Sequence, residues 1–348
     1  MAMPTLPRRI TGGVDTHLDV HVVSALDELG TLLGVESFPT TPAGYRTTLR
    51  WLRSFGHVEL VGVEGTGSYG AGLTRHLLGE GIPVVEVDRP NRQRRRKRGK
   101  SDPQDAITAA RAAQSGDALG AAKTRNGSVE AIRVLRLVRM SARRNRNRTL
   151  NQMRSIVSTA PDQLREQFRG VTGHQLVKGA AKLRPGGRHD VTSVTKLALR
   201  TLARRIIAID EEMAEVEAIL NPMVETAAPE LVALVGVGAE CASALLVAAG
   251  DNPERLRNEA TFAHLCGAAP LDASSGKQER HRLNRGGDRQ ANAALWRIVM
   301  TRIVYDPRTK TYINRRMREG LTKTEAMRCL KRYVAREVFA HLPRERLA

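Results

Sequence analysis

The N-terminal third of the chain alternates between short apolar runs and amphipathic segments in an order that few folds accommodate. Residues 12–38 contain three runs rich in β-branched side chains and separated by tight turns, which predicts three strands. The segments that follow alternate between helix and strand, with expected bounds 42–55, 58–64, 68–78 and 82–87, and a last helix that begins near Pro103. The predicted order is therefore β-β-β-α-β-α-β-α.

This order describes an antiparallel meander whose first strand continues into an α/β part, which is the order of the ribonuclease H-like fold. Acidic residues fall at the ends of the predicted elements. Asp15 ends the first strand and Glu64 ends the fourth strand. Asp102 and Asp105 stand three apart at the start of the last helix, so their side chains share one face of its first turn.

Four carboxylates at such positions are typical of a site for divalent cations. A carboxylate at the end of a buried strand is costly unless it is paired, hydrated or bound to a cation. Oxygen ligands suit Mg²⁺ or Mn²⁺, and two such ions about 3.5–4 Å apart can activate both reacting oxygens of a phosphodiester. A helix-cap role is the alternative, with Asp102 at the N-cap, Pro103 at the first helical position and Asp105 at the positive end of the helix dipole.

A strongly basic stretch stands directly before Asp102. Six of the seven residues from position 94 to position 100 are basic: Arg94, Arg95, Arg96, Lys97, Arg98 and Lys100. Across the chain, 56 lysines and arginines outweigh 36 acidic residues, for a net charge of +20, which indicates an anionic partner, most simply nucleic acid. Aromatic residues make up only 3% of the chain, which argues against base stacking on an aromatic platform.

The cysteines and the hydropathy of the chain indicate the cellular compartment in which the protein is expected. The three cysteines are far apart and form no CxxC pair, which excludes a disulfide framework or a zinc ribbon and fits a reducing compartment. The N-terminus, MAMPTLPRRI, has no apolar core of a signal peptide. The most apolar window, 231–250, is interrupted by glycines and Glu240 and is a poor membrane span. We therefore expect a soluble cytoplasmic protein with no membrane partner.

The middle segment, 126–225, predicts two long helices. Eight arginines and no acidic residue lie between positions 131 and 154. Four of these arginines fall at 3-3-4 spacing on one helical face: Arg133, Arg136, Arg139 and Arg143. A solvated basic face is one interpretation, and a phosphate-binding stripe is the one favoured by the lack of acidic residues nearby.

The second helix of this segment is expected from about Ser193 to Leu220. Its apolar residues step 4-3-4-3-4, the heptad rhythm of a coiled coil: Leu202, Ile206, Ile209, Met213, Val216 and Leu220. This seam can pack against the helix predicted over 130–168 of the same chain, or against a second subunit. Both interpretations remain open.

Residues 226–348 predict a mostly helical third part. Gly236 and Gly238 separate two apolar helical segments, a pattern typical of a helix-hairpin-helix, whose backbone N–H groups bind a DNA phosphate, and also of an ordinary packing unit. Further along, Ser275 lies in a polar Ser-Ser-Gly loop that by itself predicts only a turn. Basic residues follow this loop: Lys277, Arg280, Arg282 and Arg285.

Three blocks of the sequence resemble those of the DEDD transposases of insertion-sequence family 110. The blocks are GVDTHLDVHVV, VGVEGTGSYGAGL with HLLGEGIPVVEVDRP, and KSDPQDAITAARAA. The resemblance implies a ribonuclease H-like (RuvC-like) domain over 1–125, similar to Holliday-junction resolvases. It implies that the matching acids are catalytic and bind Mg²⁺ (or Mn²⁺): Asp15, Glu64, Asp102 and Asp105.

The C-terminal part resembles the serine-bearing domain of the same family. The family's G-x-x-P…S-G block corresponds to Gly267, Pro270, Ser275 and Gly276. The resemblance implies that Ser275 is the nucleophile, with Ser274 as the alternative, and that the reaction passes through a phosphoserine-linked DNA.

Partners follow from the same resemblance. It implies the DNA of the element ends and target, a structured guide RNA, and a homo-oligomer between dimer and tetramer that uses the coiled coil, in a bacterial cytoplasm at the nucleoid. Two other classes remain alternatives: a metal-dependent junction nuclease that uses water, and a non-catalytic nucleic-acid-binding protein.

Overall fold

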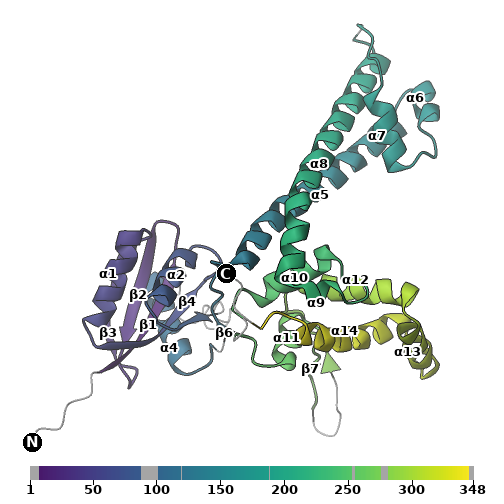
Figure 1. Ribbon diagram of the computed structural model, residues 1–348. Helices are drawn as coiled ribbons and strands as arrows, with labels where there is room; N and C mark the ends of the chain where they lie inside the picture. Colours follow the sequence, from purple (N-terminus) through teal and green to yellow (C-terminus); the bar gives the residue numbers. More distant parts are fainter. Residues whose placement is uncertain are drawn as a thin grey trace, which may run out of the picture. The chain divides into compact units, whose positions relative to one another are not determined.

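The computed structural model describes residues 8–87, 101–118, 120–187, 189–252, 255–275 and 281–344 (Figure 1). The chain forms two compact units. The first contains the chain up to Glu130 together with 246–292 and the segment from Lys331 onward. The second contains Ala131–Leu245 and Ala293–Leu330. The three-part division by sequence stays a prediction.

A six-stranded mixed sheet forms the core of the first unit, in the order β3-β2-β1-β4-β5-β6. Its strands are β1 (Arg9–Thr16), β2 (Val20–Leu26), β3 (Leu32–Pro39), β4 (His57–Glu64), β5 (Val84–Val87) and β6 (Gly120–Ala121). The first three strands form an antiparallel meander, β4 lies parallel to β1, and β5 lies parallel to β4. The predicted meander and α/β order are confirmed and are compatible with a ribonuclease H-like fold; the short antiparallel β6 was not predicted.

Helices cover this sheet at the positions that the sequence predicts. They are α1 (Pro42–Arg53), α2 (Ala71–Gly79) and α4 (Asp102–Gln114). Thr41 begins α1 as its N-cap, because its side chain accepts a hydrogen bond from the backbone N–H of Gly44 at 3.1 Å. Leu49 and Leu52 of α1 and Leu73 and Leu77 of α2 enter the apolar core of the sheet.

The helix α4 packs so closely on the sheet that its backbone contacts the backbone of β1 at Gly13. A Cβ atom placed on Gly13 of β1 would lie 2.2 Å from the carbonyl oxygen of Ala106 and from the amide nitrogen of Ala110. Ser24 of β2 donates a hydrogen bond to the same Ala106 carbonyl at 2.9 Å. Gly13 and Asp15 stand two apart on β1 and therefore point to the same face of the sheet. The close packing thus brings the first turn of α4 toward Asp15.

The second unit is built on two long antiparallel helices, α5 (Ser128–Ser158) and α8 (Val191–Ala227) (Figure 1). Arg139 pairs with Glu217 at 2.6 Å, and Arg146 pairs with Asp210 at 3.1 Å. The two pairs are seven residues apart on both helices and run in opposite directions, so α5 and α8 lie antiparallel along this stretch. Ile206 and Leu220 of the predicted seam are buried, whereas its coiled-coil packing and its use between subunits stay predictions.

The helix α8 is longer than the sequence predicts. It continues past Leu220 and through Pro222 to Ala227. A proline inside a helix removes one backbone hydrogen bond, but Val224 and Ala227 beyond it are buried, and their burial favours continuation. Between the long helices, α6 (Asp162–Gln167) and α7 (Gly173–Ala181) close a second apolar core.

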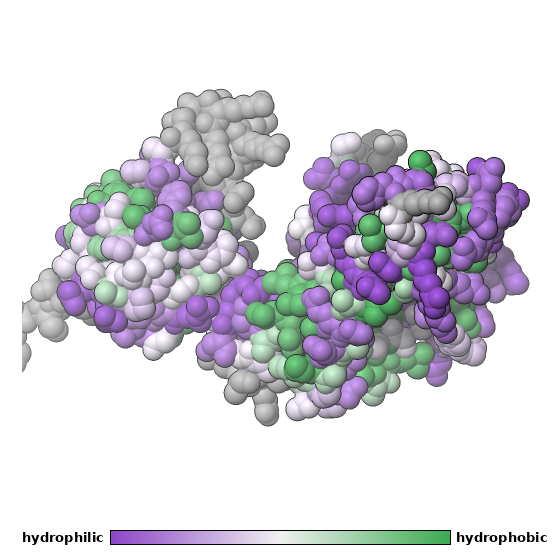
Figure 2. Space-filling view, turned by 90° about the horizontal axis from the view of Figure 1, so that it is seen from above, coloured by the Kyte–Doolittle hydropathy of each residue, from purple (hydrophilic) through white to green (hydrophobic). Residues whose placement is uncertain are grey.

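The remainder of the described chain is mostly helical, as predicted. It contains α9 (Pro229–Val232), α10 (Ala239–Ala249), α11 (Glu259–Leu265), a hairpin of β7 (Leu271–Asp272) and β8 (His281–Arg282), α12 (Arg289–Tyr305), α13 (Pro307–Arg318) and α14 (Lys323–Ala340). Hydrophilic side chains cover much of the surface (Figure 2). None of the helices described is both long and apolar enough to cross a membrane.

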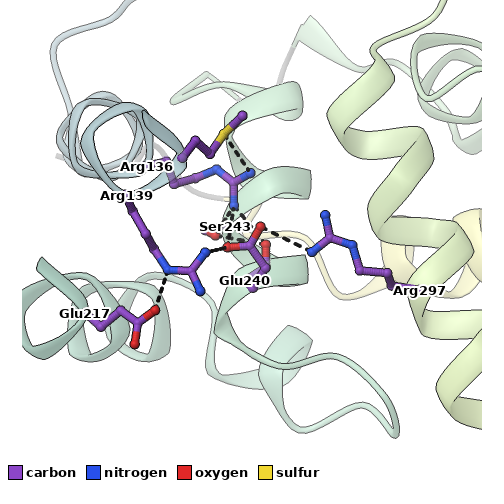
Figure 3. Close-up of polar contacts among 7 residues, drawn as sticks. Arg136, Arg139, Glu217, Glu240, Ser243 and Arg297 are labelled. Carbon is purple, nitrogen blue, oxygen red and sulfur yellow. Dashed lines mark hydrogen bonds and ion pairs between the residues drawn. The ribbon is translucent and has the colours of Figure 1, made fainter. Parts of the chain in front are cut away.

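One carboxylate, Glu240 of α10, joins several helices of the second unit (Figure 3). Its side chain forms ion pairs with Arg136 at 3.6 Å, with Arg139, and with Arg297 of α12 at 3.3 Å. Arg136 is only 4% exposed and donates hydrogen bonds to the Glu240 carbonyl at 2.8 Å and to Ser243 Oγ at 2.6 Å. Glu240 is therefore a shared counter-ion for arginines that have lost most of their hydration.

We predict that Gly13→Ala destabilises the protein by roughly 1–3 kcal/mol or more, because the added methyl group meets the backbone of α4 and forces the helix off the sheet. Urea unfolding measures the change. Gly79→Ala is the matched control: its Cβ meets nothing within 4 Å, and alanine in a helix is favoured by roughly 0.5–1 kcal/mol. Equal stability of the Gly13→Ala protein and the wild type would contradict this packing.

We predict that Glu240→Gln lowers the free energy of unfolding by roughly 1–3 kcal/mol, because it leaves partly buried arginines without their counter-ion. Glu59→Gln is the control. Glu59 pairs with Arg9 at 3.2 Å, but both side chains are more than half exposed, so its loss is expected to cost under about 1 kcal/mol. Similar costs for the two substitutions would refute a special role of Glu240.

Candidate metal and nucleic-acid site

The end of β1 and the start of α4 bring three side chains together. Asp15 is the penultimate residue of β1, His17 follows the strand, and Asp102 is the first residue of α4. His17 Nε2 lies 3.2 Å from Asp15 Oδ2 and 3.5 Å from Asp102 Oδ2. One ligand atom from each residue lies within 4.8 Å of the others, so the three can bind one metal ion.

Burial and like charge make this cluster unfavourable without a cation. Asp15 is 7% exposed, and its pKa is raised above the ordinary value. Burial is the largest cause; His17 opposes the shift, whereas the nearby charges of Asp105 and Asp102 add to it. Apart from the ion pairs of His17 with the two aspartates, the buried atoms Asp15 Oδ2 and His17 Nε2 have no hydrogen-bond partner among the described residues. A bound cation would satisfy both atoms, so the donor set fits a metal ion.

The four predicted acids meet at one edge of the sheet but differ in their roles there. Asp15 and Asp102 belong to the cluster, and Asp105 is buried close enough to act on the pKa of Asp15. Glu64 ends β4 beside β1, where Thr16 Oγ1 donates a hydrogen bond to its carbonyl at 2.8 Å. The Glu64 side chain is not one of the three clustered ligands. Its metal-binding role stays a prediction.

The helix-cap alternative for Asp102 is wrong in detail. Ser101 occupies the N-cap of α4 and makes no side-chain capping bond, and Asp102 is the first helical residue. Its carboxylate points instead toward His17. Asp102 and Asp105 both remain in the first turn of α4, at the positive end of the helix dipole, so only the N-cap part of the alternative is corrected.

His17 is a member of the cluster that was not predicted from the sequence. Carboxylates are the usual ligands of Mg²⁺, and only carboxylates were expected here. The signal was present in the GVDTH block, because residues two apart in an extended segment point to the same side. An imidazole among carboxylates adds a nitrogen ligand, which Mn²⁺ accepts more readily than Mg²⁺ does.

Several predicted nucleic-acid-binding residues lie outside the described residues. They are the basic stretch Arg94, Arg95, Arg96, Lys97, Arg98 and Lys100, and also Lys277 and Arg280. Arg282 of β8 and Arg285 beyond it are described, and both are exposed. Their contact with nucleic acid stays a prediction.

The predicted arginine stripe on α5 needs a correction. Arg136 and Arg139 point into the protein, where acidic residues of α8 and α10 bind them (Figure 3). The sequence showed no acid near these arginines because their partners come from far along the chain. They do not present a phosphate-binding face. Arg143 is exposed and Arg133 is half-buried, so the prediction is retained only for these two.

The predicted nucleophile lies on the β7–β8 hairpin. Ser275 is exposed three residues beyond β7. The backbone N–H of Ser274 donates a hydrogen bond to Asp272 Oδ1 at 2.8 Å, which closes a turn. Both serines are exposed, so the choice between Ser275 and Ser274 as nucleophile stays a prediction.

The two predicted hairpin glycines lie between α9 and α10. Gly236 has φ +80°, a left-handed conformation that favours glycine, and Gly238 is exposed just before α10. Arg302 Nε donates a hydrogen bond to the neighbouring carbonyl of Val235 at 2.7 Å. The helix before this turn is only four residues long. DNA binding by this turn stays a prediction.

Comparison with known proteins matches both parts of this chain to one family. Residues 12–160 match the family model of DEDD transposases of IS110, and residues 228–314 match that of the transposase family IS116/IS110/IS902. A relative from Streptomyces coelicolor, the insertion element IS110 uncharacterized 43.6 kDa protein, is 31% identical over 154 residues. That match covers 43% of this chain and 38% of the relative. The chain belongs to the IS110 family of transposases.

Proposed function

We propose that this protein is a DNA transposase that cuts and rejoins DNA at a metal-assisted site. The observation that carries the proposal is the cluster of Asp15, His17 and Asp102, with Asp105 beside it, at the junction of β1 and α4. Membership of the IS110 family and the net charge of +20 support a nucleic-acid substrate.

Asp15, His17 and Asp102 would hold Mg²⁺ or Mn²⁺, with Asp105 and Glu64 at its margin. When bound, the ion neutralises charge that develops on a phosphodiester. The protein residues orient this arrangement, because α4 is fixed on β1 through Gly13 and because Thr16 links the ends of β1 and β4.

The exposed hydroxyl of Ser275 would act as the nucleophile. Its oxygen forms a bond to phosphorus while the bond from phosphorus to a deoxyribose oxygen breaks. The serine loses its proton, and the leaving sugar oxygen gains one. A hydroxyl of a second DNA strand then displaces the serine oxygen, so the exchange consumes no external energy source.

Assembly and guidance belong to the same proposal. Ser275 lies after β7, on a different element from the acidic cluster at β1 and α4, and we propose that copies of the chain assemble around the DNA to bring the two together. A structured RNA that pairs with donor and target DNA is consistent with the excess of positive charge. The proposed assembly is a dimer to tetramer.

We predict that Asp15→Asn stabilises the metal-free protein at neutral pH and abolishes its stabilisation by Mn²⁺. Because the pKa of Asp15 is raised in the folded protein, the free energy of unfolding decreases as pH rises from the ordinary pKa to the raised pKa. At neutral pH the ionised Asp15 carboxylate therefore destabilises the folded protein until a cation binds. Thermal unfolding with EDTA and with Mn²⁺ measures both effects.

The expected Mn²⁺ stabilisation of the wild type is about 2.7 kcal/mol at a hundredfold excess over Kd. Asp117→Asn is the control, because Asp117 is exposed and stands outside the cluster. An undiminished Mn²⁺ effect in the Asp15→Asn protein would exclude the cluster as the cation site.

We predict a covalent protein–DNA adduct that requires Ser275 and Asp102. Labelled element-junction DNA, co-purified RNA and Mg²⁺ are incubated with wild type, Ser275→Ala, Ser274→Ala and Asp102→Asn, and the products are run on a denaturing gel. The adduct is expected with wild type and Ser274→Ala only. Metal-dependent cleavage without an adduct, unchanged by either serine substitution, would identify a hydrolytic nuclease instead.

A further inference from the structure

Arg125 has an unusual backbone and lies beside the proposed site. It stands in the connection between β6 and α5, with φ +53°. Among the described residues, no other residue with a side chain has a positive φ. This conformation costs free energy for a residue that carries a Cβ atom, and such strain is concentrated at functional sites.

The strained backbone holds the Arg125 side chain against the loop that follows Glu64. A Cβ atom placed on Gly67 would lie 2.8 Å from Arg125 Nη2 and 3.5 Å from its Cζ. A side chain at position 67 would therefore displace the guanidinium group from this place. Gly67, Ser68 and Tyr69 are exposed, so a ligand lying on this loop can approach the guanidinium group.

The contacts of Arg125 leave hydrogen-bonding capacity unused. Its Nε is buried and has no hydrogen-bond partner among the described residues. Its Nη1 forms an ion pair with Glu130 Oε2 at 3.7 Å, a separation longer than a hydrogen bond. The side chain keeps 18% of its surface exposed. A guanidinium group with an open edge and an unsatisfied N–H is suited to an anion with several oxygens.

Positive charge gathers around this residue. Lys123 Nζ donates a hydrogen bond to the Val247 carbonyl, and Arg255 Nε donates one to the Ala121 carbonyl at 2.8 Å. Burial lowers the pKa of Lys123 to about 8, the charges of Arg255 and Arg125 add to the shift, and those of Asp288 and Glu86 oppose it. Lys123 and Arg255 are thus anchored to backbone carbonyls and repel Arg125, which increases its preference for an anion.

We propose that Arg125 is a phosphate-binding residue, whose guanidinium group, held over Gly67, binds a backbone phosphate of DNA at the Glu64 end of the site. This inference rests on the proposed function and names a residue that positions its substrate. The planar fork of arginine matches two phosphate oxygens. A phosphate bound there would fix the strand, together with the loop 65–70, beside the acidic cluster.

The test measures the affinity for a short labelled DNA duplex as a function of salt concentration, by fluorescence anisotropy. Arg125→Asn removes the guanidinium group, and asparagine tolerates positive φ. We expect roughly tenfold weaker binding and a salt slope reduced by about 0.9, the value for one lost phosphate contact. Gly67→Ala keeps the charge but displaces the guanidinium group, and we expect it to weaken binding as well.

Arg53→Gln is the matched control, because Arg53 is an exposed arginine of the same unit with an ion pair to Glu80 at 3.3 Å. Its salt slope is expected to be that of the wild type. An RNA duplex of the same sequence is measured in parallel, and a loss of affinity confined to RNA would overturn the assignment to DNA.

Stabilisation by Mn²⁺ distinguishes a phosphate-binding role of Arg125 from a structural role. We expect the Arg125→Asn protein to be stabilised by Mn²⁺ as the wild type is, since the cation ligands are unchanged. Loss of both Mn²⁺ stabilisation and DNA binding would show a structural role and overturn the inference. An unchanged salt slope in the Arg125→Asn protein would also overturn the inference. Weaker DNA binding by Arg125→Asn but not by Gly67→Ala would overturn the placement of the guanidinium group over Gly67. Failure of the wild type to bind DNA would instead refute the proposed function.

Discussion

The contact between Gly13 of β1 and the backbone of α4 determines the geometry of the acidic site. Because no side chain separates the strand from Ala106 and Ala110, the helix approaches closely enough for its first turn to meet the end of β1. Asp102 and Asp15 then converge on His17. A bulkier residue at position 13 would keep the same ligands in the sequence but separate them in space.

The two units place charge inside the protein in opposite ways. In the second unit, Glu240 is surrounded by arginines, so each charge has a counter-ion and the network stabilises helix packing. In the first unit, Asp15 has other carboxylates nearby and only a histidine to oppose them. The charges around Glu240 in the second unit are balanced without a ligand, whereas the charges around Asp15 in the first unit are not. Burial of charge is therefore a sign of a binding site only where the local charges do not balance.

The sequence predicts local features well and long-range pairing poorly. The order of strands and helices along the N-terminal third and the positions of α1, α2 and α4 follow from patterns within about twenty residues. The partners of Arg136 and Arg139 could not be predicted, because Glu217 and Glu240 come from helices about 80 to 100 residues away. His17 was within reach of the alternation rule but was hidden by the expectation of oxygen ligands. In the folded protein, Glu217 and Glu240 therefore lie beside arginines of α5 that have no acidic residue near them in the sequence.

A net charge of +20 therefore overstates the surface available to a polyanion. Part of the positive charge is used internally, as in the pairs of Arg139 and Arg146 with acids of α8. What distinguishes an arginine for binding is unsatisfied donor capacity together with accessible surface. Arg125 combines an Nε that has no hydrogen-bond partner among the described residues with a partly exposed side chain beside Gly67, whereas Arg136 is buried and hydrogen-bonded. Since Arg125 also has a strained backbone, of the kind that is concentrated at functional sites, it is a better candidate for anion binding than the paired arginines of the second unit.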